Sequence, residues 1–184
     1  MVFLGLIHYP VYNRHKKVVC TSLTPLDVHD IARASRTFGV EKYYVINPID
    51  SHLELAKTLV SFWQEGHGKE YNPARHEALK LVKPVPYLED ALKDIEKNYK
   101  IKPKLVATSA RKYENSISYK DLRRKIEEGE DIFLCFGTGW GLTDEFIASC
   151  DYILEPIYGP TDYNHLSVRS AVSIILDRLL GVNR

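Results

Sequence analysis

Three glycines follow an apolar run in the stretch FLCFGTGWGLTDEFI, residues 133–147. Glycine lets the main chain approach a ligand closely, so Gly137, Gly139 and Gly141 suggest a binding loop. Their spacing differs from the G-x-G-x-x-G of dinucleotide-binding folds, and they follow the fifth expected strand instead of the first. No lysine follows the loop, as a P-loop requires, and Asp144 would repel a phosphate. The pattern therefore argues against both kinds of phosphate site.

A flat aromatic ligand that is neutral or cationic suits this loop better. Apolar side chains lie beside the glycines, at Phe136, Trp140 and Leu142. Main-chain N–H and C=O groups can bind the edge of an adenine where glycines allow close approach. A tight turn that needs positive φ and binds nothing also explains the glycines. The loop alone leaves both interpretations open.

The loop belongs to a chain in which strand-like and helix-like segments alternate. The pattern predicts a loop at 68–73, strands at 2–9, 42–47, 82–87, 104–110, 131–137 and 151–157, and helices at 26–38, 51–66, 88–100, 118–129 and 166–181. Such alternation is typical of an α/β fold in which a mostly parallel sheet is covered by helices on both faces.

Cap signals mark several helix ends. Thr24-Pro25 is a good cap and first-turn pair, and Ser51 is the expected cap of the second helix. Gly66 and Gly181 are the expected stops of the second and the last helix.

Ligands of parallel sheets bind at the carboxyl ends of the strands. The expected strands ending near Ala107, Phe136 and Leu154 are followed by the loops TSARKYENS, GTGWGLTDE and EPIYGPTDYNH. The third loop leads into the last helix, and Asn164 and His165 stand just before it; such residues are also ordinary helix caps. We expect the site where these three loops meet.

Length and composition predict one soluble domain, residues 1–184. A chain of 184 residues with 45% hydrophobic and 27% charged residues is ordinary for a globular domain. The longest apolar run, MVFLGLI, is too short to span a membrane and lacks a secretory cleavage site, so we expect a cytoplasmic protein. Three cysteines without CxxC spacing predict free thiols, and the histidines show no ligand spacing, so no metal is expected.

The formal net charge is only +1, but the charges are unevenly distributed along the chain. Residues 97–125 carry ten Lys or Arg and two acids, whereas residues 126–151 carry seven acids and no base. This split predicts one positive and one negative face, unless the segments are solvated helices with unrelated surfaces.

Two motifs together resemble a known family. The pair formed by FGTGWGL and the terminal HLSVRSAVSIILDRLLG resembles the SPOUT class of knotted RNA methyltransferases, which use S-adenosylmethionine. The segment DVHDIARASRTFGVEKYYVIN looks like the first motif of that family, with Arg33 six residues before Gly39. The likeness extends from Val2 to Gly181. It implies a C-terminal trefoil knot, a homodimer and an RNA substrate, either tRNA or rRNA.

The resemblance also implies roles for individual residues. Thr108 and Ser109 would end the first knot strand, Pro156 and Ile157 would face the adenine, and the glycine loop would wrap the cofactor. The full set of implied S-adenosylmethionine contacts is Thr108, Ser109, Phe136, Gly137, Thr138, Gly139, Trp140, Gly141, Leu154, Pro156, Ile157, Asn164, Leu166 and Ser167.

Two residues are candidates for catalysis. Arg33 could position a phosphate or lower the pKa of a hydroxyl by its charge, and His165 could act as a base. Their ordinary alternatives are a surface arginine and a helix-start histidine. The expected RNA contacts are the basic residues Arg14, Lys16, Arg111 and Lys112.

The sequence departs from the family pattern at three places. Asp27 stands where asparagine is common, His165 stands where asparagine is common, and the glycine loop lacks a glutamate. These departures leave open which atom is methylated. The missing loop glutamate and the near-neutral net charge slightly favour one alternative, a non-catalytic knotted module that binds S-adenosylmethionine or RNA. A nucleotide-binding flavodoxin-like or Rossmann domain is a third interpretation, which the acids of residues 126–151 disfavour.

Overall fold

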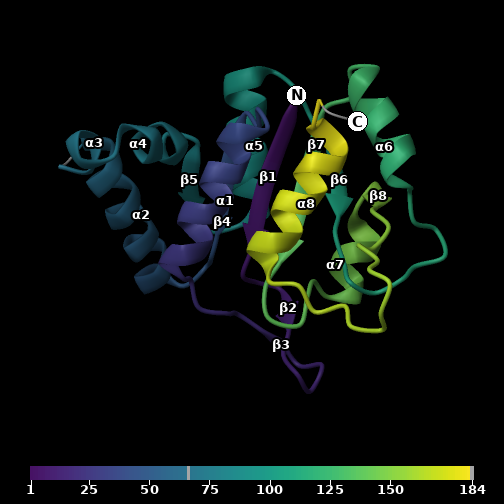
Figure 1. Ribbon diagram of the computed structural model, residues 1–184. Coiled ribbons are helices and arrows are strands. Elements are labelled where there is room, and N and C mark those ends of the chain that lie inside the picture. The colour runs from purple at the N-terminus through teal and green to yellow at the C-terminus, as the bar shows by residue number, and fades with distance from the viewer. Residues whose placement is uncertain (66, 183–184) are drawn as a thin grey trace.

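The computed structural model describes residues 1–65 and 67–182 and is built around a six-stranded sheet (Figure 1). The strand order is β5-β4-β1-β7-β6-β8, and the neighbouring strands pair in parallel. The strands are β1 (Val2–Ile7), β4 (Lys42–Ile46), β5 (Val82–Val85), β6 (Lys104–Ala107), β7 (Ile132–Gly137) and β8 (Tyr152–Ile153). The two central strands, β1 and β7, are apolar and buried almost throughout, as expected of a sheet with two covered faces.

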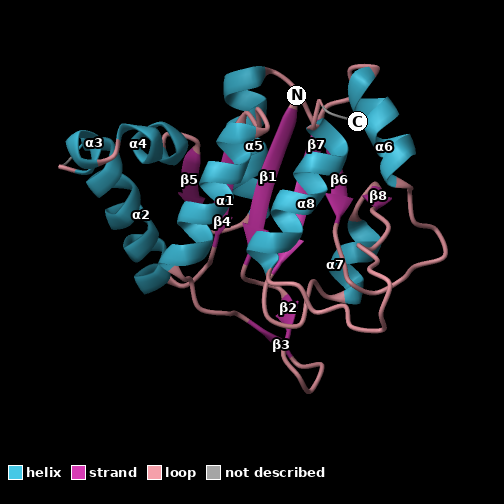
Figure 2. Ribbon diagram, viewed as in Figure 1, coloured by secondary structure: helices cyan, strands magenta, loops and turns pink. Residues whose placement is uncertain are grey.

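Helices cover both faces of the sheet (Figure 2). They are α1 (Pro25–Thr37), α2 (Asp50–Glu65), α3 (Gly68–Tyr71), α4 (Pro73–Leu79), α5 (Leu88–Tyr99), α6 (Tyr119–Glu127), α7 (Asp144–Ser149) and α8 (Val168–Leu180). One apolar cluster joins the sheet to α1, α2, α4, α6 and α8, and a second joins it to α5 and α7. The predicted α/β class is confirmed.

The helix ends agree with the cap signals in part. Thr24 caps α1, because its Oγ1 accepts a hydrogen bond of 3.2 Å from the Asp27 N–H. The prediction for Ser51 was wrong: α2 begins one residue earlier, at Asp50, where an acidic side chain suits the positive end of the helix dipole. The expected stop at Gly66 lies outside the described residues. Gly181 ends α8 as predicted.

The loop predicted at residues 68–73 is wrong, because α3 and the start of α4 occupy it. The Asn72 side chain accepts from the Arg75 N–H at 3.0 Å and caps α4, and Pro73 is its first residue. This Asn-Pro pair is the same kind of helix start as Thr24-Pro25. At the other end of the chain, the predicted strand 151–157 shortens to β8, because it leaves the sheet before Pro156.

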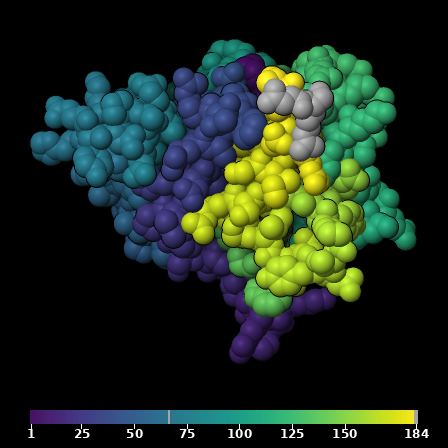
Figure 3. Space-filling view, in the orientation of Figure 1, coloured from purple at the N-terminus to yellow at the C-terminus, as the bar shows by residue number. Residues whose placement is uncertain are grey.

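A small hairpin between β1 and α1 was not predicted. Its strands β2 (Val11–Tyr12) and β3 (Val18–Val19) pair antiparallel. Figure 1 shows the hairpin projecting beyond the carboxyl ends of the sheet strands, and Figure 3 shows it at the surface (purple). Val11 at its base is fully buried, whereas the tip is exposed.

The predicted separation into a positive and a negative face is wrong. Bases of residues 97–125 pair with acids of residues 126–151, which mixes the two signs of charge on the surface. The ion pairs are Lys104–Asp151 at 3.1 Å, Arg111–Asp144 at 2.7 Å, Arg123–Glu127 at 2.9 Å and Lys125–Glu130 at 3.6 Å.

Two features are absent from the described residues. Within that part of the chain, no helix combines the length and the apolar character needed to cross a bilayer. The same residues form no group of three or more His, Cys, Asp or Glu side chains that could hold a metal ion.

Candidate active site

The three loops predicted from the strand ends leave neighbouring strands at one edge of the sheet. The N–H and the hydroxyl of Thr108 both donate to the Cys135 carbonyl, at 3.1 and 2.9 Å, which fixes the end of β6 against β7. The Leu154 N–H donates to the Ala107 carbonyl at 2.9 Å, which fixes the end of β8 against β6. The sheet therefore brings the three loops together, as expected.

The segment that follows β8 runs across the loop that follows β6. The Ile117 N–H donates to Ile153 at 2.8 Å, and the Glu155 N–H donates back to Ile117 at 3.0 Å. Further along, the Asn164 side-chain amide donates to the Ala110 carbonyl at 3.1 Å. Residues 154–164 are thus held over residues 110–117 by contacts at both ends.

An apolar floor lies beneath these loops. Phe136 is 2% exposed and Leu154 is 1% exposed. Ile157 and Val168 pack against the same cluster, so the third loop and the start of α8 share this floor with the end of β7. Phe136 and Leu154 close the bottom of the site, and the partly buried Ile157 leaves apolar surface that an aromatic ring can contact.

Main-chain N–H groups beside this floor are available to a ligand. Within the described part of the chain, the structure records no hydrogen bond from the N–H groups of Thr138, Gly139, Ile157, Tyr158 or Gly159. Unpaired N–H donors beside an apolar floor fit the adenosine part of S-adenosylmethionine, which offers ring and ribose acceptors together with a flat face.

The glycines of the second loop are required by the protein's own packing. A Cβ atom on Gly137 would lie 2.7 Å from the Leu142 nitrogen. Gly139 has φ +58°, and a Cβ there would lie 3.0 Å from the Tyr12 carbonyl oxygen. Gly141 also has a positive φ of +95°. Both positive angles lie in the region that glycine adopts most readily, so the loop is a tight turn pressed against the hairpin.

The hairpin and the glycine loop form a continuous main-chain network. The Tyr12 N–H donates to Gly141 at 2.9 Å, and the Trp140 N–H donates to Tyr12 at 3.0 Å. Behind them, the Thr138 hydroxyl contacts the Thr21 hydroxyl and donates to the Ile7 carbonyl at 3.2 Å. The Trp140 side chain points outward and is 62% exposed.

Arg111 contacts the hairpin and the second loop from its position in the first loop. Its guanidinium pairs with Asp144 at 2.7 Å and donates to the Leu142 carbonyl at 2.7 Å. It also lies 5.5 Å from the ring centre of Tyr12 and 5.7 Å from that of Tyr113, within cation–π range. Arg111 was predicted as an RNA contact; the structure places it as a link between the hairpin, the first loop and the second loop.

The Asp144 carboxylate is stabilised in its charged form. The Tyr113 hydroxyl donates to it at 2.9 Å and is the main cause of its lowered pKa, and Arg111 acts in the same direction. Burial, and then the bond to Asp144, raise the pKa of Tyr113 to about 12. Neither Tyr12 nor Tyr113 was singled out from the sequence, because their partners lie far away in the chain.

Arg33 lies apart from these loops, in an open groove between α1 and α8. The groove is lined mainly by Asp30, Arg33, Ala34 and Thr37 of α1, and by Ser167, Arg169, Ser170 and Ser173 at the start of α8. The structure records no ion pair for Arg33 among the described residues. Ser167 caps α8, accepting from the Ser170 N–H at 3.3 Å, and so connects the groove to the third loop.

The aspartate that departs from the family pattern has a partner across this groove. Asp27 lies 3.4 Å from the Arg169 guanidinium, which also reaches Asp30 at 3.4 Å. Asp27 is only 16% exposed, so the pair is partly shielded from water. The charge at residue 27 therefore ties the first-motif helix to the last helix.

The two remaining groups of predicted residues are at the surface. His165 is exposed, and its ring packs edge-on against Tyr163 with centres 5.3 Å apart. No contact among the described residues joins His165 to Arg33. Arg14 and Lys16 lie at the exposed hairpin tip, and Lys112 is exposed in the first loop.

Sequence reasoning missed a buried histidine at the end of β1. His8 is fully buried, and its Nδ1 lies 2.9 Å from the Ile46 carbonyl oxygen, whereas its Nε2 has no partner. Burial lowers the pKa of His8 and keeps the ring neutral. A lone histidine within a strand-like run carries no signal that distinguishes it from a core residue.

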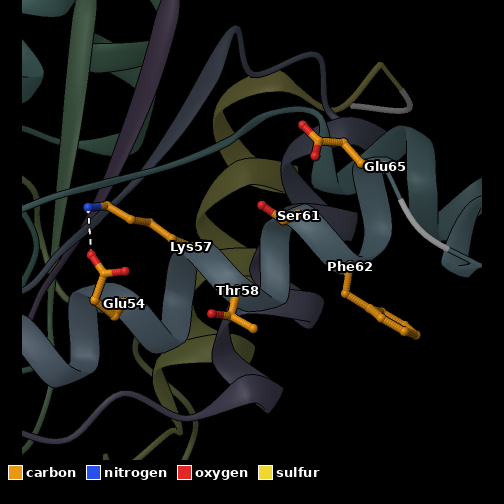
Figure 4. Close-up of a pocket in the computed structure, with 6 residues that line it drawn as sticks. All are labelled: Glu54, Lys57, Thr58, Ser61, Phe62 and Glu65. Atoms are coloured by element: carbon orange, nitrogen blue, oxygen red, sulfur yellow. Dashed lines mark hydrogen bonds and ion pairs between the residues drawn. The ribbon is translucent and has the colours of Figure 1, made fainter.

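A second hollow on the surface contains no predicted site residue. It runs along one side of α2 and is lined by Glu54, Lys57, Thr58, Ser61, Phe62 and Glu65 (Figure 4). Its Lys57–Glu54 pair at 2.9 Å is an ordinary exposed pair within one helix. This hollow has no group suited to methyl transfer.

Comparison with known proteins supplies the biochemical context. A family model described as SAM-dependent RNA methyltransferase matches residues 1–181. A protein of Aquifex aeolicus is 44% identical over 184 residues, covering 100% of this chain and 90% of the relative. A tRNA (guanine-N(1)-)-methyltransferase of Oleidesulfovibrio alaskensis is 43% identical over 180 residues, covering 98% of this chain. The chain spans only 42% of the length of that relative.

The fold also matches solved structures. The SpoU methyltransferase AviRb from Streptomyces viridochromogenes, in complex with the cofactor AdoMet, aligns with a TM-score of 0.56 and 15% identity. The alignment covers 98% of this chain and 56% of AviRb. At that identity the likeness concerns the fold, and it agrees with the SPOUT-like architecture expected from the motifs.

Proposed function

This chain belongs to the family of S-adenosylmethionine-dependent RNA methyltransferases, and from that premise we propose that it methylates a nucleotide of tRNA. The observation that carries the proposal is the meeting of three loops over an apolar floor at the carboxyl edge of the sheet. The name of the 43%-identical relative supports tRNA over rRNA. Because the chain spans 42% of that relative, the guanine N1 atom in its name is not carried over.

S-adenosylmethionine is held, in this proposal, by the strand-end loops. Phe136, Leu154 and Ile157 support the adenine, with Pro156 beside them, and the unpaired N–H groups of the second and third loops bind its polar edges. Thr108, Ser109, the glycine loop, Asn164, Leu166 and Ser167 complete the walls. The crossing of residues 154–164 over residues 110–117 supports a C-terminal trefoil knot.

The main task of the protein is alignment. Bound S-adenosylmethionine supplies a methyl group on a positively charged sulfur, and transfer to a nucleophile is an in-line displacement. The loops fix one reactant and the groove beside Ser167 receives the other. Arg33 holds a phosphate or the accepting hydroxyl there, and its positive charge lowers the pKa of that hydroxyl. A base is needed only where the accepting atom begins protonated, and exposed His165 is a candidate for it.

RNA contacts are assigned to exposed bases around this edge. Arg14 and Lys16 at the hairpin tip and Lys112 in the first loop can each neutralise a phosphate, so binding should weaken as salt rises. Arg111 contributes indirectly, through its bonds to Asp144 and Leu142. We place the protein in the cytoplasm, where tRNA is modified.

The groove between α1 and α8 is proposed as the homodimer interface. Its α8 side includes the small exposed residues Ser167, Ser170 and Ser173, which allow a second copy to approach closely. Arg33, lying in that groove, would then hold the RNA where the two subunits meet.

Transfer of a labelled methyl group tests the function. The protein is incubated with labelled S-adenosylmethionine and with unmodified tRNA or rRNA, and the RNA is digested to nucleosides to locate the label. The proposal expects label in a tRNA nucleoside. Label confined to rRNA would correct the substrate. Cofactor binding with no transfer to either RNA would favour the non-catalytic module, which the missing loop glutamate also favours.

A further inference from the structure

Trp140 is presented to solvent from a rigid base. Its side chain is 62% exposed, whereas the other tryptophan of the chain, Trp63, is 8% exposed. Isolated exposed apolar side chains are common and require no explanation. Trp140 is different in that its main chain is fixed on both sides while its ring is left outside.

The fixation of Trp140 comes from main-chain bonds and turn geometry. Its N–H donates to the Tyr12 carbonyl at 3.0 Å, and the next residue, Gly141, accepts from the Tyr12 N–H at 2.9 Å. The flanking glycines have φ of +58° and +95°, angles that direct the chain into and out of the turn. The loop therefore holds the main chain of Trp140 in a defined place at the surface before any ligand arrives.

The neighbouring hairpin tip carries concentrated positive charge. Arg14, Lys16 and Lys17 are exposed and follow Tyr12, the residue hydrogen-bonded to Trp140, by two to five positions. The tip is ordered: the Asn13 carboxamide oxygen accepts from the His15 N–H at 2.9 Å and from the Lys17 N–H at 3.0 Å.

The first acid after the glycine loop is already neutralised by a base of the protein. Asp144 follows the glycine loop, but it is paired with Arg111 at 2.7 Å and accepts a hydrogen bond from Tyr113. The third loop adds a second exposed ring, Tyr163, which is 74% exposed. Aromatic faces beside lysine and arginine are the combination that binds single-stranded nucleic acid, through base stacking and phosphate contacts.

We propose that Trp140 is the surface on which an unpaired base of the RNA stacks, while the hairpin tip holds the adjoining phosphates. The substrate is then RNA with a single-stranded loop at the binding site, because bases inside a duplex have no free face. The inference rests on the proposed function and deepens it. It assigns the Trp140 ring to RNA in place of the cofactor contact that the family resemblance implies.

The test compares RNA binding by matched aromatic variants. Fluorescence anisotropy measures the affinity of the full chain for a labelled RNA stem–loop and for the fully paired duplex of the same stem. The variants are Trp140→Ala, the conservative Trp140→Phe, and Phe62→Ala. Phe62 is the control because it is 53% exposed on α2, away from the strand-end loops. Calorimetry measures the S-adenosylmethionine affinity of each variant.

We expect Trp140→Ala to weaken stem–loop binding roughly 5- to 150-fold, the range for losing one stacked base. Trp140→Phe should restore most of the affinity, and duplex binding should not change. Stem–loop binding should also quench the tryptophan emission of the wild type, since Trp140 is the exposed tryptophan. Phe62→Ala and the cofactor affinities should match the wild type.

Three results would overturn the inference alone: wild-type stem–loop affinity in Trp140→Ala, an equal loss on duplex and stem–loop, or a loss confined to S-adenosylmethionine. Absence of RNA binding and of methyl transfer in the wild type would overturn the proposed function as well. If the wild type instead bound a protein through Trp140 and bound no RNA, the assignment of Trp140 to RNA would be wrong.

Discussion

The two sides of the candidate site are built differently. The strand-end loops are tied to one another by main-chain bonds, by the Arg111–Asp144 pair and by Asn164. The groove with Arg33 is open, and the interaction recorded across it is the Arg169 contact with Asp27 and Asp30. A cofactor that binds the same way in every turnover suits a preorganised side, whereas an RNA, and a second subunit, need an accessible one.

Replacing Arg33 should have the largest effect, lowering methyl transfer while leaving S-adenosylmethionine affinity unchanged. Arg33→Ala removes the charge that the groove offers to the RNA, so methyl transfer should fall about a hundredfold or more, the usual cost of one transition-state contact. Labelled-methyl transfer and calorimetry measure the two sides in parallel, with exposed Arg36→Ala on the same helix as control. Unchanged turnover in Arg33→Ala would remove Arg33 from the site.

Replacing Gly137 should damage the preorganised side. A Cβ atom at this position would lie 2.7 Å from the Leu142 nitrogen, so Gly137→Ala must displace the loop. We expect the S-adenosylmethionine affinity to fall about tenfold or more, because loss of one hydrogen bond to the displaced loop costs about 1–3 kcal/mol. The control is Gly129→Ala, which follows α6 outside the three loops; φ is positive there, but a Cβ meets nothing within 4 Å. Equal cofactor affinity in both variants would show that the loop does not hold the cofactor.

Replacing Arg111 tests whether this residue links the loops or contacts the RNA directly. Arg111→Ala should lower cofactor affinity a few-fold, because the exposed ion pair with Asp144 is worth about 1 kcal/mol or less. The dependence of RNA affinity on salt should stay the same, whereas Lys16→Ala should reduce that slope by about one phosphate contact. A reduced slope in Arg111→Ala would restore the original prediction of a direct RNA contact.

The smallest expected effect concerns pH. Burial lowers the pKa of His8 below its ordinary 6.5; His52 adds to this, and the Ile46 carbonyl and Asp27 oppose it. Below a pH of about 6.5, His8 binds a proton in the unfolded chain but stays neutral in the folded chain. The free energy of unfolding should therefore fall as pH drops from about 7 to about 5. Urea unfolding at each pH measures this slope. His8→Asn should flatten it, and exposed His15→Asn should not; equal slopes in all three proteins would contradict the assignment.

The sequence predicted the sheet and the meeting of the three loops at its edge because both depend on short-range patterns. The apolar run of β7 and the alternation of elements were enough to predict a parallel sheet covered by helices on both faces. The rule that ligands bind at the carboxyl ends of the strands then pointed to the three loops. Asn72-Pro73 had the signal of a helix start and was overlooked.

Other features depend on partners distant in the chain. The tip of the hairpin lacks the Asn-Gly or Asp-Gly signal of a short turn, and its strands have two residues each. Without the hairpin, the atom that faces Gly139, the Tyr12 carbonyl oxygen, could not be predicted. The Arg111–Asp144 pair joins residues 33 positions apart, so it could not be predicted from local patterns either.

Calorimetry on the wild-type chain without RNA tests the central claim most directly. If the strand-end loops form a preorganised cofactor site, S-adenosylmethionine should bind in the micromolar range, and NAD and ATP should not, because the glycine loop offers no site for phosphate. Preference for NAD or ATP, or S-adenosylmethionine binding that appears only after RNA is added, would contradict it.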